Sequence, residues 1–197
     1  EGDTLTVDAF YRITSSKKLG LTLVYDQLES IRVEAGRLAG EQTLTADRLD
    51  LELLGVARAS LDIRAGLVDL QMERNTSADL RVEADSLYAN LKGYTDTHIY
   101  TSGGAIDLAM SEHASLDLEG VCPGMTASLT DNARLKASGL QADTVTALLN
   151  TSANARVYAT SDLAYEGRGS SRLFVYGQPA IRILGLFDSA ELHKVPE

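Results

Sequence analysis

Val68-Asp69-Leu70-Gln71-Met72 is followed nineteen residues later by Leu87-Tyr88-Ala89-Asn90-Leu91, and again by Ile106-Asp107-Leu108-Ala109-Met110. In all three segments the first, third and fifth residues are apolar, and the residues between them are mostly polar. This two-residue alternation is typical of a β-strand with one buried face. The constant spacing indicates that one structural unit repeats along the chain.

The same unit extends in both directions. The first residue of each copy lies 18 to 20 residues from the next, at Leu49, Val68, Leu87, Ile106, Met125, Val145, Leu163 and Ile181. A second alternating segment begins about eight residues after each of these positions. The residues predicted to face inward include Leu51, Leu70, Leu108, Gly167 and Gly185 in the first segment and Leu61, Leu80, Ile99, Leu118, Val157, Val175 and His193 in the second. Residues that favour turns separate the two segments, at Gly55, Gly93, 75–77, 130–132, 150–152 and 169–171. Each repeat therefore predicts two strands and short turns.

Two all-β architectures are compatible with short strands at this spacing, an antiparallel sandwich and a parallel β-helix. A sandwich gives no reason to keep similar residues in register every nineteen positions. A stacked coil does, because equivalent residues of successive turns lie directly above one another. The sequence therefore predicts a right-handed parallel β-helix (solenoid) with rungs of about 19 residues.

The chain is predicted to form a single domain over residues 1–197, with regular rungs at 44–185. Residues 1–43 alternate less regularly, for example at Val7, Ala9, Tyr11 and Ile13, and are expected to form irregular N-terminal rungs and a cap. Residues 186–197 are expected to form a C-terminal cap, with 184–187 closing that end of the coil. Such caps shield the backbone groups of the terminal strands.

Composition narrows the classes of partner. The 197-residue chain has a net charge of −10 and no cluster of Lys and Arg, which argues against nucleic acid. No segment approaches the roughly 18 apolar residues of a membrane-spanning helix.

The single cysteine, Cys122, lies in the turn-like Cys122-Pro123-Gly124 and is expected to be structural. The acidic surface favours a neutral or basic partner.

Three segments carry a family resemblance: Ser102-Gly103-Gly104-Ala105-Ile106-Asp107, residues 151–159, and Val175-Tyr176-Gly177-Gln178-Pro179. They resemble the Ser-Gly-Ala-Gly-Asp-Ile repeat and the Tyr-Gly-Asn-Pro segment of the head-GIN domain family, whose members are described as bacterial auto-transporter adhesins, many from Bacteroidetes. The resemblance covers roughly residues 5–190. It implies a right-handed β-helix on a secreted envelope protein, often lipid-anchored, and it supplies no catalytic residues.

Two columns of outward side chains are candidate sites. One contains His98 between Asp79 and Asp117, followed by Lys136 and Arg156. It is interpreted as charge pairing between rungs, or alternatively as an acid/base pair like those of β-helix enzymes that cleave polysaccharides. The neighbouring column contains Arg81, Tyr100, Glu119, Ser138, Tyr158 and Tyr176. Tyr100, Tyr158 and Tyr176, with His98 beside them, are the predicted ligand-binding residues, because exposed tyrosines on a rigid sheet can stack on sugars or proteins.

No metal or cofactor is predicted. Asp47, Asp85 and Asp143 share one position in the repeat, but the intervening rungs supply no side-chain ligands except Ser161. The three histidines lie in different rungs or columns, so zinc spacing is not met.

The sequence thus favours a non-enzymatic, extracytoplasmic, adhesin-like protein that presents a flat surface to a glycan or a cell-surface protein. It is expected to be secreted, at the cell surface or in the periplasm. The sequence leaves open whether it is lipid-anchored through a removed N-terminal leader and whether it forms a homo-oligomer. The alternatives are a pectinase-like, polysaccharide-active enzyme and a structural or lipid-associated envelope protein. The short turns leave no groove walls for an enzyme.

Overall fold

The computed structural model describes residues 22, 24, 25 and 27–196, and this part of the chain forms β-strands and no helix. Its ten strands are β1 Ser30–Ala39, β2 Leu44–Arg74, β3 Ser77–Gly93, β4 Asp96–Glu112, β5 Ser115–Leu129, β6 Arg134–Leu149, β7 Asn154–Gly167, β8 Arg172–Tyr176, β9 Ala180–Leu186 and β10 Glu191–Lys194. Most strands bend at a corner of the coil and continue. The 31-residue β2 spans more than one turn for this reason.

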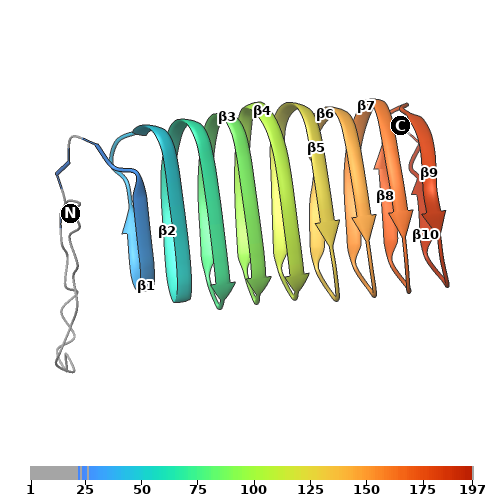
Figure 1. Cartoon of the computed structure of the whole chain (residues 1–197), viewed down its shortest axis with the longest axis horizontal. Helices are drawn as coiled ribbons and strands as arrows, with labels where there is room; N and C mark the ends of the chain where they lie inside the picture. The colour runs from blue at the N-terminus through green and yellow to red at the C-terminus, as the bar shows by residue number, and fades with distance from the viewer. Residues whose placement is uncertain (1–21, 23, 26, 197) are drawn as a thin grey trace.

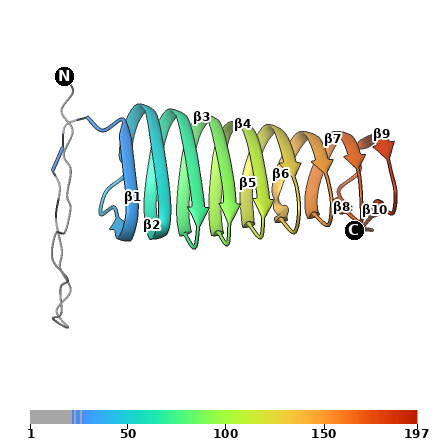
Figure 2. The same ribbon diagram turned by 60° about the horizontal axis from the view of Figure 1, so that its bottom comes forward.

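The strands stack as a parallel solenoid, as predicted. The sheet order is β1-β2-β3-β4-β5-β6-β7-β8-β10, with β9 added on β7, and every pairing is parallel. Figures 1 and 2 show the rungs side by side along one axis. The near strands in Figure 1 run downward as the chain advances to the right, which makes the coil right-handed.

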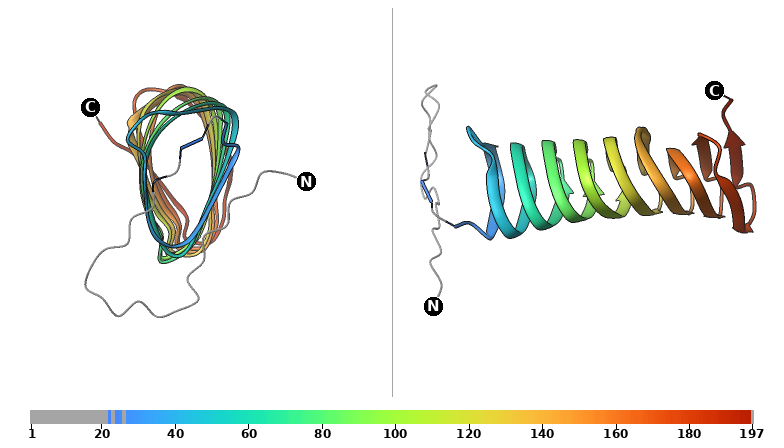
Figure 3. Two further views of the ribbon diagram at one scale, coloured as in Figure 1. Left: turned by 90° about the vertical axis from the view of Figure 1, so that its left-hand side faces the viewer. Right: turned by 90° about the horizontal axis from the view of Figure 1, so that it is seen from above.

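The predicted register is confirmed through the middle of the coil. Val68 pairs with Leu87, and the ladder of first residues continues through Ile106, Met125, Val145, Leu163 and Ile181. Viewed along the axis, the turns superimpose as a closed oval (Figure 3). The residues predicted to fill it are all 5% exposed or less and belong to one core: Leu51, Leu61, Leu70, Leu80, Ile99, Leu108, Leu118 and Val157.

One residue per rung adopts a left-handed backbone conformation at the turn. These residues have φ between 60° and 95° and stack at Gly55, Arg74, Gly93, Glu112, Asp131, Thr151, Gly169 and Asp188. Rung-to-rung hydrogen bonds continue through the turn, as from Asn132 N–H to Glu112 O at 2.8 Å. The turn glycines and the 130–132, 150–152 and 169–171 segments were therefore placed correctly from sequence.

Bulges account for the 20- and 18-residue steps. Register shifts occur after Asp117, after Ala137 and after Ala142. The register predicted from spacing is wrong beside them: Gly139, rather than Ser138, pairs with Glu119. Bulges add residues to one strand and re-aim its side chains, so an average spacing does not locate them.

The last rung also departs from the predicted register. Gly167 pairs with Leu186 instead of Gly185, because of a shift after Tyr165. His193, predicted to face inward beside Val175, pairs with Phe174 on the outer face. The spacing between β8 and β10 is thus 19 residues, from Phe174 to His193, and Leu192 takes the inward position next to the core.

The two ends of the coil differ. Val7, Ala9, Tyr11 and Ile13 lie outside the described residues, whereas β1 already pairs with β2, with a bulge after Val33. At the other end, the Tyr165 ring is fully buried and its hydroxyl donates a hydrogen bond to Glu191 O at 3.2 Å. Burial raises the pKa of this phenol. Residues 184–187, predicted to close this end, leave Leu184, Leu186 and Phe187 43–50% exposed.

Candidate functional site

The charged column lies in one register on the outer face. Asp79, His98, Asp117, Lys136 and Arg156 are consecutive Cα partners. The His98 Nδ1 atom lies 3.3 Å from Asp79 Oδ1, and the side chains are 46% and 75% exposed. Asp117 pairs with Lys136 rather than with His98. The contacts are therefore those of exposed ion pairs between rungs, which stabilise the fold only weakly.

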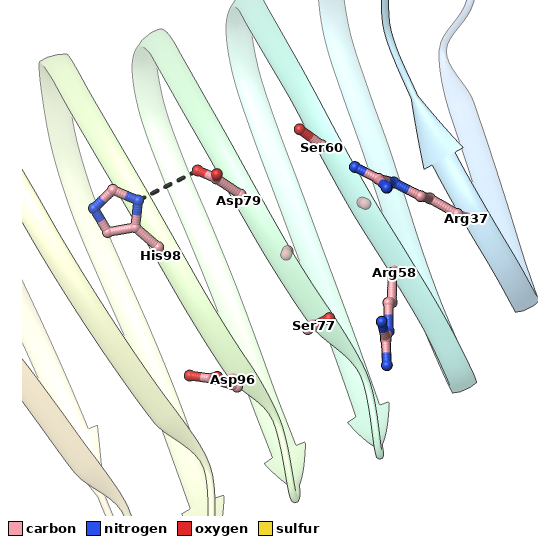
Figure 4. Close-up of a pocket in the computed structure, with 9 residues that line it drawn as sticks. Arg37, Arg58, Ser60, Ser77, Asp79, Asp96 and His98 are labelled. Carbon is pink, nitrogen blue, oxygen red and sulfur yellow. Dashed lines mark hydrogen bonds and ion pairs between the residues drawn. The ribbon is translucent and has the colours of Figure 1, made fainter.

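His98 and Asp79 line a shallow, open depression of about 350 Å³ on this face. Its other charged residues are Arg37, Arg58 and Asp96, each from a different rung (Figure 4). In Figure 4 the side chains project from a continuous sheet, and the dashed contact joins only His98 and Asp79. The depression has cationic and anionic groups but no enclosing wall of long loops.

The structure divides the three predicted tyrosines into two groups. Tyr158 and Tyr176 are Cα partners in neighbouring rungs and are partly buried. Tyr100 is 45% exposed and lies under the Arg81 guanidinium, whose carbon is 5.7 Å from the ring centre. The rungs of β5 and β6 separate Tyr100 from Tyr158, a gap of roughly 14 Å at normal strand spacing. A continuous tyrosine stripe is therefore limited to β7 and β8.

An aromatic cluster that sequence reasoning missed lies beside Tyr158 and Tyr176. Phe174 stacks on His193 with ring centres 4.8 Å apart, and the Arg156 guanidinium lies 5.8 Å from the Phe174 ring centre. His193 Nε2 contacts Glu191 at 2.7 Å, and this hydrogen bond, with Arg172, lowers the pKa of Glu191. The signal was available: Phe174 follows Arg156 in the charged column. The one-residue register error at His193 concealed the stack.

Charge is distributed unevenly along the coil. Residues 1–131 contain 11 Lys and Arg against 22 Asp and Glu, whereas residues 132–197 contain seven against six. Four of those seven cations, Arg134, Lys136, Arg156 and Arg172, project from β6, β7 and β8 on the face with Tyr158 and Tyr176. The net charge of the chain therefore does not describe the surroundings of the tyrosine pair.

Cys122 does not have the environment of a nucleophile. It is 5% exposed, and burial raises the pKa of its thiol to about 11. The reactive thiolate form is therefore scarce at neutral pH. Over residues 27–196, no group of three or more His, Cys, Asp and Glu side chains is arranged to hold a metal ion.

These features define a β-solenoid in which aromatic rings and cations gather on the outer face of its C-terminal rungs. The sequence profile of the family described as "Putative auto-transporter adhesin, head GIN domain" matches residues 75–179, and the chain belongs to this family. The matched segment begins in the turn before β3 and ends at residue 179, three residues after the end of β8. No curated protein and no solved structure matched the chain in the corresponding comparisons. In the described part of the chain, no helix could cross a membrane.

Proposed function

We propose that this protein is a non-enzymatic, adhesin-like binding protein located outside the cytoplasm, which presents the outer face of β7, β8 and β10 to a glycan or a surface protein. The observation that carries the proposal is the contiguous patch formed by Tyr158, Tyr176, Phe174, His193 and Arg156. These residues are called the aromatic face below. The family description supports an adhesin-like role and an extracellular or surface location.

The aromatic face suits binding for two physical reasons. Aromatic rings and Arg contribute most to affinity at protein interfaces, and rings stack on the apolar faces of sugars. The rings project from a hydrogen-bonded sheet, so little conformational entropy is lost when a partner binds. The cations on β6, β7 and β8 allow neutral or anionic partners at this face. The net charge of the whole chain had instead favoured a neutral or basic partner.

A glycan array compared among three variants tests the proposal. The double variant Tyr158→Ala/Tyr176→Ala should lose binding at least about tenfold, as expected for residues at the centre of an interface. The matched control is Tyr88→Ala/Tyr94→Ala, which removes two exposed tyrosines, 46% and 64% accessible, from other parts of the coil. Tyr100→Ala should have a smaller effect. Equal binding by both double variants, with unchanged circular dichroism, would exclude the aromatic face.

The depression around His98 supports a second candidate, a polysaccharide-active enzyme. It places a histidine, two aspartates and two arginines within one open site. Incubation with pectin or alginate, followed by assay for new reducing ends or unsaturated products, distinguishes the candidates. Cleavage that disappears in His98→Ala but persists in His113→Ala would establish the enzyme and overturn the non-enzymatic proposal.

A further inference from the structure

The C-terminal end of the coil concentrates exposed apolar side chains. Ile181, Ile183, Leu184, Leu186 and Phe187 are between 37% and 52% exposed, and all five fall within seven consecutive residues. Ile181 pairs with Leu163 and Ile183 pairs with Tyr165, and both of these partners in the preceding rung are buried. Ile181 and Ile183 therefore continue columns of the core. Contiguous apolar surface of this kind marks an interaction site rather than ordinary surface.

The same end presents open strand edges. Among the described residues, β9 pairs only with β7 and β10 pairs only with β8. Their outer edges face along the coil axis, at the right-hand end in Figures 1 and 2. Unpaired N–H and C=O groups beside apolar side chains form a template for another β-strand.

The charge of this end favours a second copy of the chain as the occupant. Residues 180–196 contain two cations, Arg182 and Lys194, and two carboxylates, Asp188 and Glu191, so their formal charge is zero in a chain of −10. Two acidic chains repel each other over most of their surfaces, but this repulsion is smallest at an electroneutral end. The two signs balance at this end, so little net repulsion opposes the contact.

We propose that two copies associate tail to tail through this end, with β9 of each copy beside β9 of its partner in antiparallel orientation. A twofold axis perpendicular to the sheet brings β9 against β9 and β10 against β10 at once. Ile181 and Ile183 of the two copies then cover one another, and the open edges are paired. The contact closes at two copies and leaves the aromatic faces accessible, so the dimer would present two of them.

Sedimentation velocity of the intact chain over a range of concentrations tests the association. The wild type should show a monomer–dimer equilibrium. Ile181→Lys/Ile183→Lys should raise the dimer Kd at least about 100-fold, since central apolar residues each commonly contribute tenfold or more. The matched control is Val121→Lys/Leu148→Lys, which alters two side chains 52% and 37% exposed on the sides of the coil and should leave the Kd unchanged.

A crosslinking experiment tests the orientation. Arg182→Cys, treated with a short bismaleimide, should yield covalent dimers only, because tail-to-tail packing brings the two introduced thiols together, while Cys122 is buried. A monomer at all concentrations, a ladder of larger oligomers, or a Kd unaffected by Ile181→Lys/Ile183→Lys would overturn the proposal. So would co-sedimentation of the wild type with phosphatidylcholine vesicles that Ile181→Lys/Ile183→Lys abolishes while the protein stays monomeric.

Discussion

The middle rungs, β3 to β5, and the last rung, β9 with β10, contain the same apolar columns in different environments. Leu87, Ile106 and Met125 are 2–3% exposed, whereas Ile181 in the same column is 37% exposed. A residue in a middle rung is covered by a neighbouring rung on each side, whereas Ile181 in the last rung has a neighbouring rung on one side only. Burial in a solenoid is therefore a property of neighbouring rungs as much as of the side chain. Substitutions at equivalent positions should have large effects in the middle and small ones at the end.

The largest expected contrast is between Leu80→Asp and Ile183→Asp. Leu80 is 1% exposed, and a carboxylate there would lie unpaired in a dry core, so the variant should lose at least about 4 kcal/mol and fail to fold. Ile183 is 52% exposed, and the same change should lower the free energy of unfolding by less than about 1 kcal/mol. Urea denaturation followed by circular dichroism measures both, at a protein concentration low enough that the chain is monomeric.

Asp79→Ala is the control for register, because Asp79 precedes Leu80 and faces outward with a 75% exposed side chain. It should be nearly neutral. Similar midpoints for Leu80→Asp and Asp79→Ala would contradict the assignment of these two faces.

Replacing one glycine in the middle of the coil and one at its end compares how well the backbone of each region tolerates a Cβ atom. Gly120 has φ of 120°, and a Cβ there would lie 1.8 Å from the Thr101 carbonyl oxygen of the preceding rung. Gly120→Ala should therefore cost about 3 kcal/mol or more. The three atoms nearest to a Cβ at Gly185 all belong to the Phe187 ring, the closest at 2.4 Å, and Phe187 is 43% exposed, so its ring can turn away. Gly185→Ala should cost less than about 1 kcal/mol, and a thermal melt showing equal losses would contradict this account.

The sequence predicted the middle of the coil closely because an identical unit repeats there without insertion. The columns of Leu80 and of His98 could both be assigned, since one strand alternation fixes both faces. The site was predicted less well. The bulges after Asp117 and Ala137 divide the tyrosine column, and their positions depend on backbone packing between rungs rather than on residue type. The Phe174–His193 stack was missed because the last step was misjudged by one residue.

Thr151 provides a test in the opposite direction, toward greater stability. It adopts φ of 63° in the turn column, where a β-branched residue is strained by roughly 1–2 kcal/mol. Thr151→Gly should raise the free energy of unfolding by up to about 1 kcal/mol, after the larger backbone entropy of glycine in the unfolded state is subtracted. In the last turn, Asp188 has φ of 60° but accepts a hydrogen bond from Gly169 N–H at 3.1 Å. Asp188→Gly should therefore give no gain in the same urea titration.

The smallest expected effect concerns a buried corner column occupied by Thr76, Thr95, Ala114, Ala133, Ala153 and Ser171. The Thr95 hydroxyl oxygen is buried without a hydrogen-bond partner among the described residues, whereas Ser171 Oγ donates to Leu149 O at 3.4 Å. Thr95→Val preserves the volume and removes the unpaired polar atom, so it should stabilise the fold by about 0.5–1 kcal/mol. Ser171→Ala, toward the last rung, removes a hydrogen bond and should destabilise it by a similar amount. Opposite shifts of the melting temperature would show that this corner is dry at Thr95. A loss of stability in Thr95→Val would instead show that a water molecule satisfies the hydroxyl there.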